Sequence, residues 1–274
     1  MSTNLFRNIE ARLTDSMTAE RFCAITNLRN RVRGKCHKIN PLGGPDSEIL
    51  LAEDGDEAIH FCRRNRHNRY KRGVRTAIDR LARDYHLDRL ADLRGGTFID
   101  CGANVGELGL WAKTRGFDYI PFEPEALEAR CVDLNVFDGV ETCRRAGLWN
   151  KTTTLTLYNR ADEADSSFLP GEGGGGNTIE LPVTRLDEAL DLSQADRPII
   201  FKLEAEGAEP EVLEGARESL RHIDYVAVDC GYERGPEKNH TVVETNTALV
   251  DHGFRLIAAQ FQRVTALYGR PDRA

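Results

Sequence analysis

The sequence predicts an α/β fold in which helices cover both faces of a doubly wound, mostly parallel, seven-stranded sheet with one reversed strand near its edge. Three observations predict it. Short apolar segments alternate with helical patterns from residue 97 onward, as in consecutive β–α units. Several of these segments end in an acidic residue, which places polar groups at the carboxyl edge of the sheet. The last two segments, 255–258 and 264–268, have so short a connection that they should pair antiparallel.

The composition is that of a globular protein with room for one large domain. The chain has 274 residues, of which 40% are hydrophobic and 30% charged, and its formal net charge is −7. This charge argues against nucleic acids or anionic membranes as partners. No apolar run approaches the ~18 residues of a transmembrane helix, and residues 1–16 lack the apolar region of a signal peptide. We therefore expect a cytoplasmic protein, and the oligomeric state, a homo-oligomer included, stays open.

The cysteines favour a reducing compartment. Their number, seven, is odd, and no C-x-x-C pair occurs. Some of them lie near histidines in the N-terminal third, but the spacing matches no standard zinc pattern (Cys36, His37, His60, Cys62, His67). We expect no metal site.

Residues 1–66 are expected to form an N-terminal extension of helices and a hairpin, followed by the main domain over 67–274. Scattered apolar positions in residues 1–44 fit one or two helices, and 40–45 is predicted to be a loop. Residues 49–61 then alternate as a hairpin that turns at Asp54-Gly55.

A basic segment joins the extension to the main domain. Residues 63–75 contain seven basic side chains and no acid (Arg63, Arg64, Arg66, Arg69, Lys71, Arg72, Arg75). Three interpretations are open: a solvated helix start that pairs with the acidic remainder of the chain, a contact with an anionic substrate group, or a contact with nucleic acid. Apolar positions from Val74 to Tyr85 then step at helical intervals toward the sheet.

The central feature of the sequence is a strand, a glycine-rich turn and a helix. Phe98 and Ile99 are apolar and β-prone, and apolar positions from Leu108 to Ala112 follow at helical spacing. The turn between them reads Asp100-Cys101-Gly102-Ala103-Asn104-Val105-Gly106. Such a turn lets the backbone pass close to a ligand and directs helix N–H groups toward it.

The next strand, 119–122, ends at Glu123, about 20 residues after the turn, where an acid can accept hydrogen bonds from ribose hydroxyls. A dinucleotide site would have G-x-G-x-x-G, but the middle glycine is missing here. Asp100 would also lie poorly beside a pyrophosphate, and it suits a cation such as the amino and sulfonium groups of S-adenosylmethionine. We therefore expect this cofactor; a nicotinamide or flavin site and a turn without a ligand are the two alternatives.

The expected cofactor contacts follow the order of the motif. Asp100 would meet the amino group, directly or through water, and the turn backbone would pass along the amino-acid end (Gly102, Ala103, Asn104, Gly106). Glu123 would hold the ribose. A helix over 127–134 and a third strand over 140–143 come next, and Ala146 and Gly147, just beyond that strand, are expected near the adenine.

In the middle of the chain, the residue pattern predicts a strand over 152–158 that is antiparallel to its neighbour. It also predicts a strand and a short helix over 179–190. Between them, 171–176 is rich in glycine and fits either a surface linker or a lid over the substrate. Further on, a helix with Pro210 in its first turn, a strand over 225–229 and a helix over 241–251 complete the alternation.

The apolar strand 199–203 leads into the candidate catalytic residues. In an extended segment alternate residues share one side, so Lys202, Glu204 and Glu206 should point together at the strand's carboxyl end. Glu204 or Glu206 could act as a base, and Lys202 could keep Glu204 ionised or orient an acceptor oxygen. Alternatively, the trio only keeps the strand end soluble. Asp229, Glu233 and His240 are weaker candidates.

These motifs together resemble the FkbM-type S-adenosylmethionine-dependent methyltransferases. The matches are the turn 100–106, Glu123-Pro124, and the segment 202–209 with Val212-Leu213-Glu214-Gly215. The chain departs from the family pattern at Glu204, where Asp is usual, and at Asp229, where Glu is frequent. The resemblance implies a class I, Rossmann-like methyltransferase that methylates a hydroxyl of a sugar, a glycan or a small secondary metabolite. An RNA-directed methyltransferase, a nicotinamide-dependent oxidoreductase and a non-catalytic binding protein are the alternatives.

Overall fold

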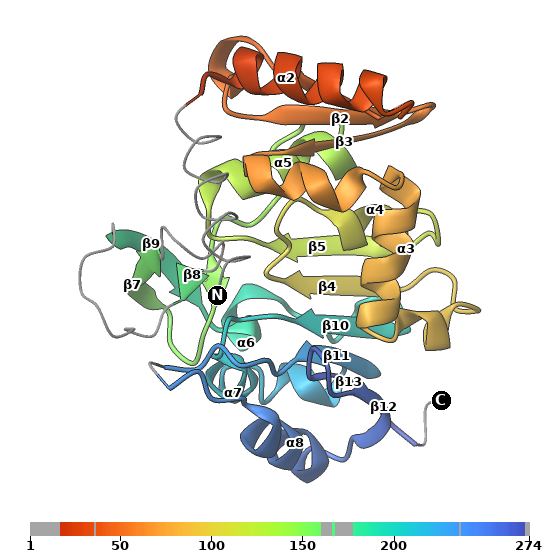
Figure 1. Ribbon diagram of the computed structural model, residues 1–274. Coiled ribbons are helices and arrows are strands. Elements are labelled where there is room, and N and C mark those ends of the chain that lie inside the picture. Colours follow the sequence, from red (N-terminus) through yellow and green to blue (C-terminus); the bar gives the residue numbers. More distant parts are fainter. Residues whose placement is uncertain (1–16, 36, 160–165, 168–177, 236, 272–274) are drawn as a thin grey trace.

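The computed structural model describes residues 17–35, 37–159, 166–167, 178–235 and 237–271. Its centre is a six-stranded sheet in the order β12-β13-β11-β10-β4-β5 (Figure 1). The bounds are β4 Thr97–Cys101, β5 Asp118–Phe122, β10 Ile199–Leu203, β11 Tyr225–Asp229, β12 Arg255–Gln260 and β13 Thr265–Gly269.

The strand directions confirm a mostly parallel sheet with one reversed strand. β5, β4, β10 and β11 pair in parallel, and β13 runs antiparallel to both β11 and β12. β13 lies one strand in from the edge, as expected from the short connection that precedes it. The carboxyl ends of the four parallel strands therefore face the same side of the molecule.

The prediction of a seventh strand over residues 140–143 is wrong. Among the described residues, β5 is followed at this edge by an isolated parallel bridge between Phe122 and Arg144. The N–H of Arg144 donates to the carbonyl of Pro121, and the N–H of Glu123 donates to the carbonyl of Arg144. The buried carboxylate of Asp133 instead accepts from the N–H groups of Thr142 and Cys143. These bonds divert backbone donors from a strand ladder, so the chain passes the sheet edge without extending it.

Helices cover both faces of the sheet, and the alternation of strand residues decides which core each side chain enters. On β10, Ile200 joins one hydrophobic core, whereas Ile199 and Phe201 join the other. The first core includes residues of helices α3 Val74–Asp84, α4 Glu107–Lys113 and α5 Ala126–Val136; the second includes residues of α6 Leu186–Ala189, α7 Glu209–Glu214 and α8 Val242–Asp251. The predicted strand–turn–helix over 97–112 is confirmed by β4 and α4.

A smaller layer lies over α5 at the top of Figure 1. It contains helix α2 Ala19–Val32 and an antiparallel sheet of β1 Lys38–Pro41, β2 Leu50–Asp54 and β3 Glu57–Phe61. The hairpin is confirmed, although its turn is Gly55-Asp56, one residue later than expected. Strand β1 was missed because a proline ends it and only Ile39 of its four residues is buried. This layer shares a hydrophobic core with α3, α4 and α5.

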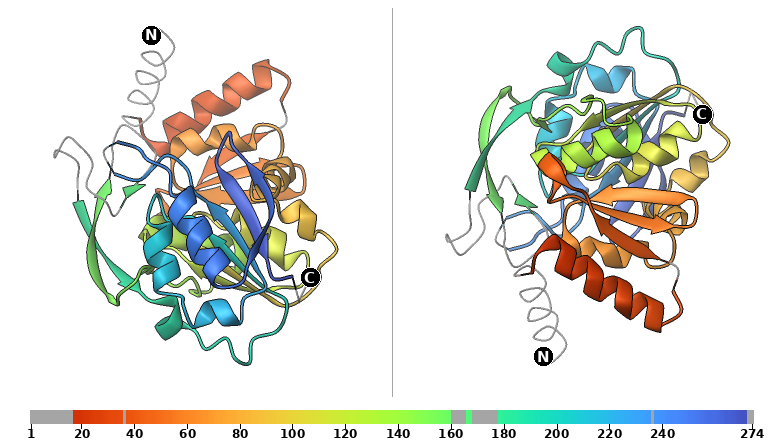
Figure 2. Two further views of the ribbon diagram at one scale, coloured as in Figure 1. Left: turned by 90° about the horizontal axis from the view of Figure 1, so that it is seen from below. Right: turned by 90° about the horizontal axis from the view of Figure 1, so that it is seen from above.

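A third sheet, β6-β9-β7-β8, stands at the edge of the molecule in both views of Figure 2. Its strands are β6 Gly147–Leu148, β7 Thr153–Asn159, β8 Ser166–Ser167 and β9 Thr178–Thr184. The antiparallel strand predicted over 152–158 is β7, and it pairs with β9 rather than with the central sheet. The glycine-rich segment 171–176 and the first sixteen residues lie outside the described residues.

Three further properties concern the described part of the chain. Six cysteines there are free (Cys23, Cys62, Cys101, Cys131, Cys143, Cys230). No group of three or more His, Cys, Asp or Glu side chains in those ranges could hold a metal ion. None of the helices described has both the length and the apolar content needed to cross a membrane.

Candidate functional site

A cavity of about 340 Å³ opens at the carboxyl ends of β4, β5 and β10. This volume falls within the range of roughly 300–1,000 Å³ that is typical of small-molecule sites. Nine of the predicted site residues line it (Asp100, Gly102, Ala103, Asn104, Glu123, Gly147, Lys202, Glu204, Glu206). Gly106 and Ala146 do not. The topology therefore gathers motifs that are far apart in the sequence around one space.

The glycine-rich turn has the left-handed backbone that its glycines permit. Gly102 has φ +72°, and a Cβ there would lie 2.5 Å from the carbonyl oxygen of Glu204, so the turn packs directly on the end of β10. Asn104 also has a positive φ of 53°, which asparagine tolerates better than most residues. Gly106 does not reach the cavity but caps helix α4 in the same conformation. Two glycines thus shape the turn, and only the first borders the cavity.

Lys202 holds the turn against β10 from inside the protein. Its Nζ donates to the carbonyl oxygens of Cys101 and Gly102, at 3.0 and 2.7 Å, and lies 3.1 Å from Asp100 Oδ1 and 3.2 Å from Glu204 Oε2. The side chain is only 3% exposed. Burial alone would lower the pKa of Lys202, but Asp100 and Glu204 raise it above its ordinary value. Lys202 is therefore a charged internal anchor.

Asp100 is buried at the end of β4. Its Oδ2 accepts a hydrogen bond of 2.7 Å from the hydroxyl of Tyr119, and its Oδ1 faces Lys202. Burial raises the pKa of Asp100, against the opposing effect of Lys202 and Tyr119. Asp100 lines the cavity while two neighbouring side chains fix its orientation.

Glu204 belongs to a network of alternating charges. Arg263 donates to Glu204 Oε1 at 2.7 Å and to Asp229 Oδ2 at 2.6 Å, so one guanidinium bridges the ends of β10 and β11. The ring of Tyr85 lies beside the cations of both Lys202 and Arg263, at 5.4 and 5.3 Å. Burial alone would raise the pKa of Glu204, but Lys202 and Arg263 hold it well below its ordinary value. A carboxylate held ionised in this way is a weak proton acceptor.

Glu123 closes the opposite side of the turn. Its Oε2 accepts from the N–H of Asn104 at 2.8 Å, and its Oε1 accepts from the N–H of Glu125 at 3.0 Å. Burial raises the pKa of Glu123 to about 8, although both hydrogen bonds oppose the shift. Each carboxylate oxygen has a further lone pair, so Glu123 can still accept hydrogen bonds from a ligand.

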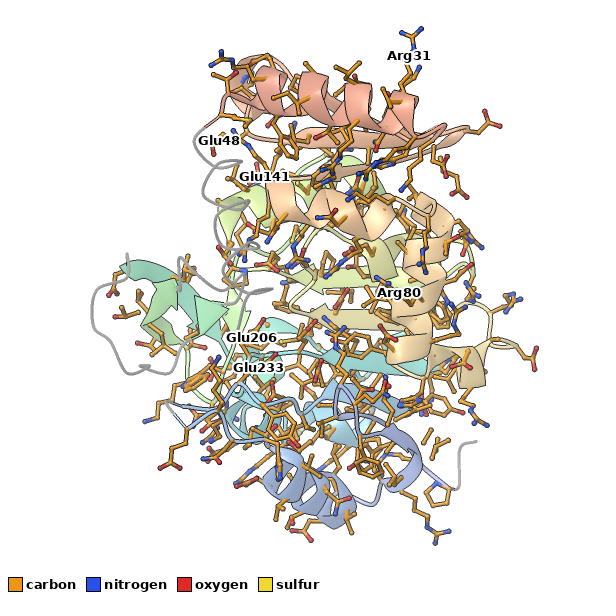
Figure 3. The ribbon with its side chains drawn as sticks, viewed as in Figure 1. Arg31, Glu48, Arg80, Glu141, Glu206 and Glu233 are labelled. Atoms are coloured by element: carbon orange, nitrogen blue, oxygen red, sulfur yellow. The ribbon has the colours of Figure 1, made fainter. Side chains whose placement is uncertain are left out.

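Glu206 borders the cavity from a turn, not from an extended strand as the sequence predicts. β10 ends at Leu203, and Glu206 lies in the following turn with a left-handed φ of 51° rather than in an extended strand. The expectation of strand alternation is therefore wrong for this residue, although it borders the same cavity as Lys202 and Glu204. Figure 3 places Glu206 and Glu233 beside the carboxyl end of β10. Non-glycine residues in this conformation are uncommon and cluster at functional sites.

The three weaker catalytic candidates, Asp229, Glu233 and His240, lie in different places in the structure. Glu233 lines the cavity, whereas Asp229 is the buried partner of Arg263 and its pKa is raised to about 6, mainly by burial. His240 lies at a separate surface hollow and packs edge-to-face on Tyr232. Among the three, only Glu233 can contact a ligand in the cavity.

The basic segment also borders the cavity. It contains the 3₁₀-helix η2 Arg64–Tyr70, and Arg63, Arg66 and Arg69 line the same cavity as Glu206 and Glu233. Arg63 pairs with Glu125 and Glu128, and Arg69 pairs with Glu107, as the interpretation of internal charge pairing expected. The same residues keep the anionic-substrate interpretation open, because they face the ligand space.

Arg263, Tyr119 and Tyr85 are site residues that the sequence analysis missed. Arg263 lies in the turn between β12 and β13, and Tyr119 and Tyr85 appeared only as apolar positions of a strand and a helix. The one signal for them in the sequence is the surplus of acids at the strand ends. Buried carboxylates need a cation or hydroxyl donors nearby.

Comparison with known proteins gives a family for this site. A family model described as the methyltransferase FkbM domain matches residues 100–256. No curated protein matches the chain. Among solved structures, the chain is similar to the ribosomal protein L11 methylase from Lactobacillus delbrueckii subsp. bulgaricus, at 14% identity and a TM-score of 0.38, covering 71% of this chain and 78% of that one. It is also similar to magnesium protoporphyrin IX methyltransferase from Synechocystis PCC 6803 with bound SAM, at 10% identity and a TM-score of 0.39, covering 74% and 83%. At these TM-scores the family assignment depends on the sequence match alone.

Proposed function

The chain belongs to the FkbM methyltransferase family, and from this premise we propose that it transfers a methyl group from S-adenosylmethionine to a hydroxyl of a sugar, a glycan or a small secondary metabolite. One observation carries the proposal: the glycine-rich turn, Glu123 and the end of β10 line a single cavity at the carboxyl edge of the sheet. In open α/β sheets this edge is the usual ligand site.

The residues of the cavity fit the cofactor. Its amino and sulfonium groups are cationic, and acidic side chains outnumber basic ones in the wall. Asn104 Oδ1 is buried without a hydrogen-bond partner in the described part of the chain, and it can accept from an amino group. Gly102 borders the cavity, and Glu123 can accept hydrogen bonds from ribose hydroxyls. When bound, S-adenosylmethionine supplies an electrophilic methyl group.

Proton acceptance is best assigned to Glu206. An aliphatic hydroxyl must lose its proton near the transition state of methyl transfer, and a positioned base assists this step. Glu204 is held ionised between Lys202 and Arg263, and Lys202 is committed to Asp100 and two carbonyl oxygens. Glu206, the other predicted base, borders the cavity from a turn with a left-handed φ of 51°.

The remaining side chains of the cavity position the reacting groups and enclose the space around them. Lys202 and Arg263 fix Glu204 and the turn backbone, and Tyr119 fixes Asp100. Holding the acceptor oxygen in line with the transferred methyl group is the main catalytic task of such a site. The wall around that space also includes Glu233 and three arginines of the basic segment (Arg63, Arg66, Arg69).

The test is calorimetric titration with S-adenosylhomocysteine, with NADH titrated in parallel. Binding of S-adenosylhomocysteine without NADH is the expected result, and it leads to a screen of glycans and hydroxylated metabolites for methyl transfer by mass spectrometry. Binding of NADH alone would overturn the proposal in favour of an oxidoreductase. Methyl transfer to RNA in the same screen would overturn the assignment of the acceptor.

A further inference from the structure

Three regularly spaced arginines of the basic segment 63–75 line the cavity. Arg63, Arg66 and Arg69 are spaced three residues apart; Arg63 is the N-cap of the 3₁₀-helix η2, and Arg66 and Arg69 lie within it. A 3₁₀-helix has three residues per turn, so side chains at this spacing share one face. All three line the cavity. We call Arg63, Arg66 and Arg69 the arginine stripe.

The two outer members of the stripe are neutralised within the protein. Arg63 lies 2.5 Å from Glu125 Oε1 and 2.6 Å from Glu128 Oε1. Arg69 lies 2.9 Å from Glu107 Oε1, which also accepts from the hydroxyl of Tyr70 at 2.8 Å. These charges already have buried or half-buried partners, so they attach the basic segment to the first turns of α4 and α5.

The middle member has no such partner. Within the described ranges, no carboxylate lies within ion-pair distance of Arg66, and its side chain makes no hydrogen bond; its Nε is buried. Burial alone would raise the pKa of Glu107, but Arg69 and Arg66 together lower it, so the positive charge of Arg66 is felt at the start of α4. A guanidinium is permanently charged and presents a planar fork of donors that matches a carboxylate or a phosphate.

We propose that Arg66 is an anion-binding residue of the cavity and pairs with a carboxylate or phosphate group of a bound ligand. The proposal rests on the proposed function, because it takes the cavity as the ligand site. Two sources can supply the anion. One is the carboxylate at the amino-acid end of the cofactor, since Arg69 of the stripe pairs with Glu107, directly after the glycine-rich turn. The other is an acidic group on the methyl acceptor.

A first experiment tests the cofactor as the source. Decarboxylated S-adenosylmethionine keeps the adenosine, the sulfonium and the amino group and lacks only the carboxylate. The parent and Arg66→Gln are titrated with both compounds, with Arg66→Lys as a variant that keeps the charge. If Arg66 holds the cofactor carboxylate, Arg66→Gln lowers the affinity for S-adenosylmethionine by about tenfold to a hundredfold. Its affinity for the decarboxylated compound stays that of the parent. Arg66→Lys should recover part of the loss.

A second experiment tests the acceptor as the source. Inorganic phosphate is titrated into each protein with and without saturating S-adenosylhomocysteine. If the anion belongs to the acceptor, Arg66→Gln leaves both cofactor affinities unchanged, and the parent binds phosphate at least about tenfold more tightly than the variant in the loaded state. Arg80→Gln is the matched control, because Arg80 is an exposed arginine of α3 that lies away from this edge of the sheet (Figure 3).

The outcomes separate the two proposals. Failure of the parent to bind either adenosyl compound overturns the methyltransferase function, whereas the phosphate titration of the unloaded protein still tests Arg66. If Arg66→Gln matches Arg80→Gln in every titration, Arg66 binds no anion. A circular dichroism spectrum of each variant identifies any loss that comes from unfolding.

Discussion

Lys202 Nζ lies 3.1 Å from Asp100 Oδ1, and both side chains are buried between β10 and β4. The same Nζ donates to two carbonyl oxygens at the start of the glycine-rich turn. The two residues belong to different motifs of the sequence, and the parallel pairing of β10 with β4 places them directly opposite each other. Lys202 is thus a positioning residue for the turn, and this role can be separated from a catalytic one.

Lys202→Met should destabilise the protein and weaken cofactor binding together. The substitution leaves Asp100 buried without its cation, and breaking a buried ion pair on one side costs about 3–5 kcal/mol. Urea denaturation measures the free energy of unfolding, and calorimetry with S-adenosylhomocysteine measures binding. Lys151→Met, at an exposed lysine, should match the parent in both. A variant that binds and unfolds like the parent but does not turn over would instead make Lys202 a catalytic residue.

Glu123→Gln should weaken cofactor binding by about tenfold or more. The amide keeps the size of the side chain, but its NH2 group replaces one of the two oxygens that accept from the N–H groups of Asn104 and Glu125. Leaving a buried donor without its acceptor costs about 1–3 kcal/mol. Calorimetry with S-adenosylhomocysteine measures the effect, and Glu48→Gln, at an exposed position, is the control. Equal affinity in Glu123→Gln and the parent would remove Glu123 from the ribose site.

Glu206→Gln and Glu204→Gln should have different effects. Loss of a general base lowers kcat by about a hundredfold or more, so Glu206→Gln should turn over slowly while it binds cofactor like the parent. Glu204→Gln removes the charge that pairs with Lys202 and Arg263, so it should lower stability and cofactor affinity first. Steady-state kinetics with the acceptor found by the screen, together with calorimetry, separates the two. Normal turnover by Glu206→Gln would exclude it as the base.

His67→Phe should make the protein more resistant to mild acid. Burial lowers the pKa of His67 to about 4, so the unfolded chain binds its proton near the ordinary value of about 6.5 and the folded chain does not. The contribution of His67 to stability is therefore complete above about pH 6.5 and is lost as the pH falls toward 4. At pH 5 this loss amounts to at most about 2 kcal/mol.

Phenylalanine at position 67 keeps a ring against Phe22, which His67 meets edge-to-face with centroids 5.3 Å apart. Urea denaturation at pH 7 and pH 5 then compares the parent with the variant. The parent should lose more free energy of unfolding over this interval than His67→Phe, and the exposed His240 supplies the control substitution, His240→Phe. Parallel losses in the parent and His67→Phe would contradict the assignment.

Local patterns determined much of the fold and of the cofactor motifs. The apolar strand 97–101 with its glycines predicted β4, the turn and α4, because the order of apolar and small residues is itself the signal for a strand followed by a tight turn. Glu123 at the end of β5 followed from the same rule of strand ends. The expected strand over 140–143 failed because its backbone donors bond to a buried carboxylate, Asp133, which no local pattern indicates.

Only the tertiary structure decided what each charged residue does. Sequence spacing placed Lys202, Glu204 and Glu206 together, but it did not show that Lys202 and Arg263 hold Glu204, or that Glu206 reaches the cavity from a left-handed turn. Nor did it distinguish Arg66 from Arg63 and Arg69, whose partners lie 38 to 65 positions away along the chain. The physical reason is that the role of a charge depends on which opposite charges lie within a few ångströms and on how much water is excluded, and only the folded chain sets both.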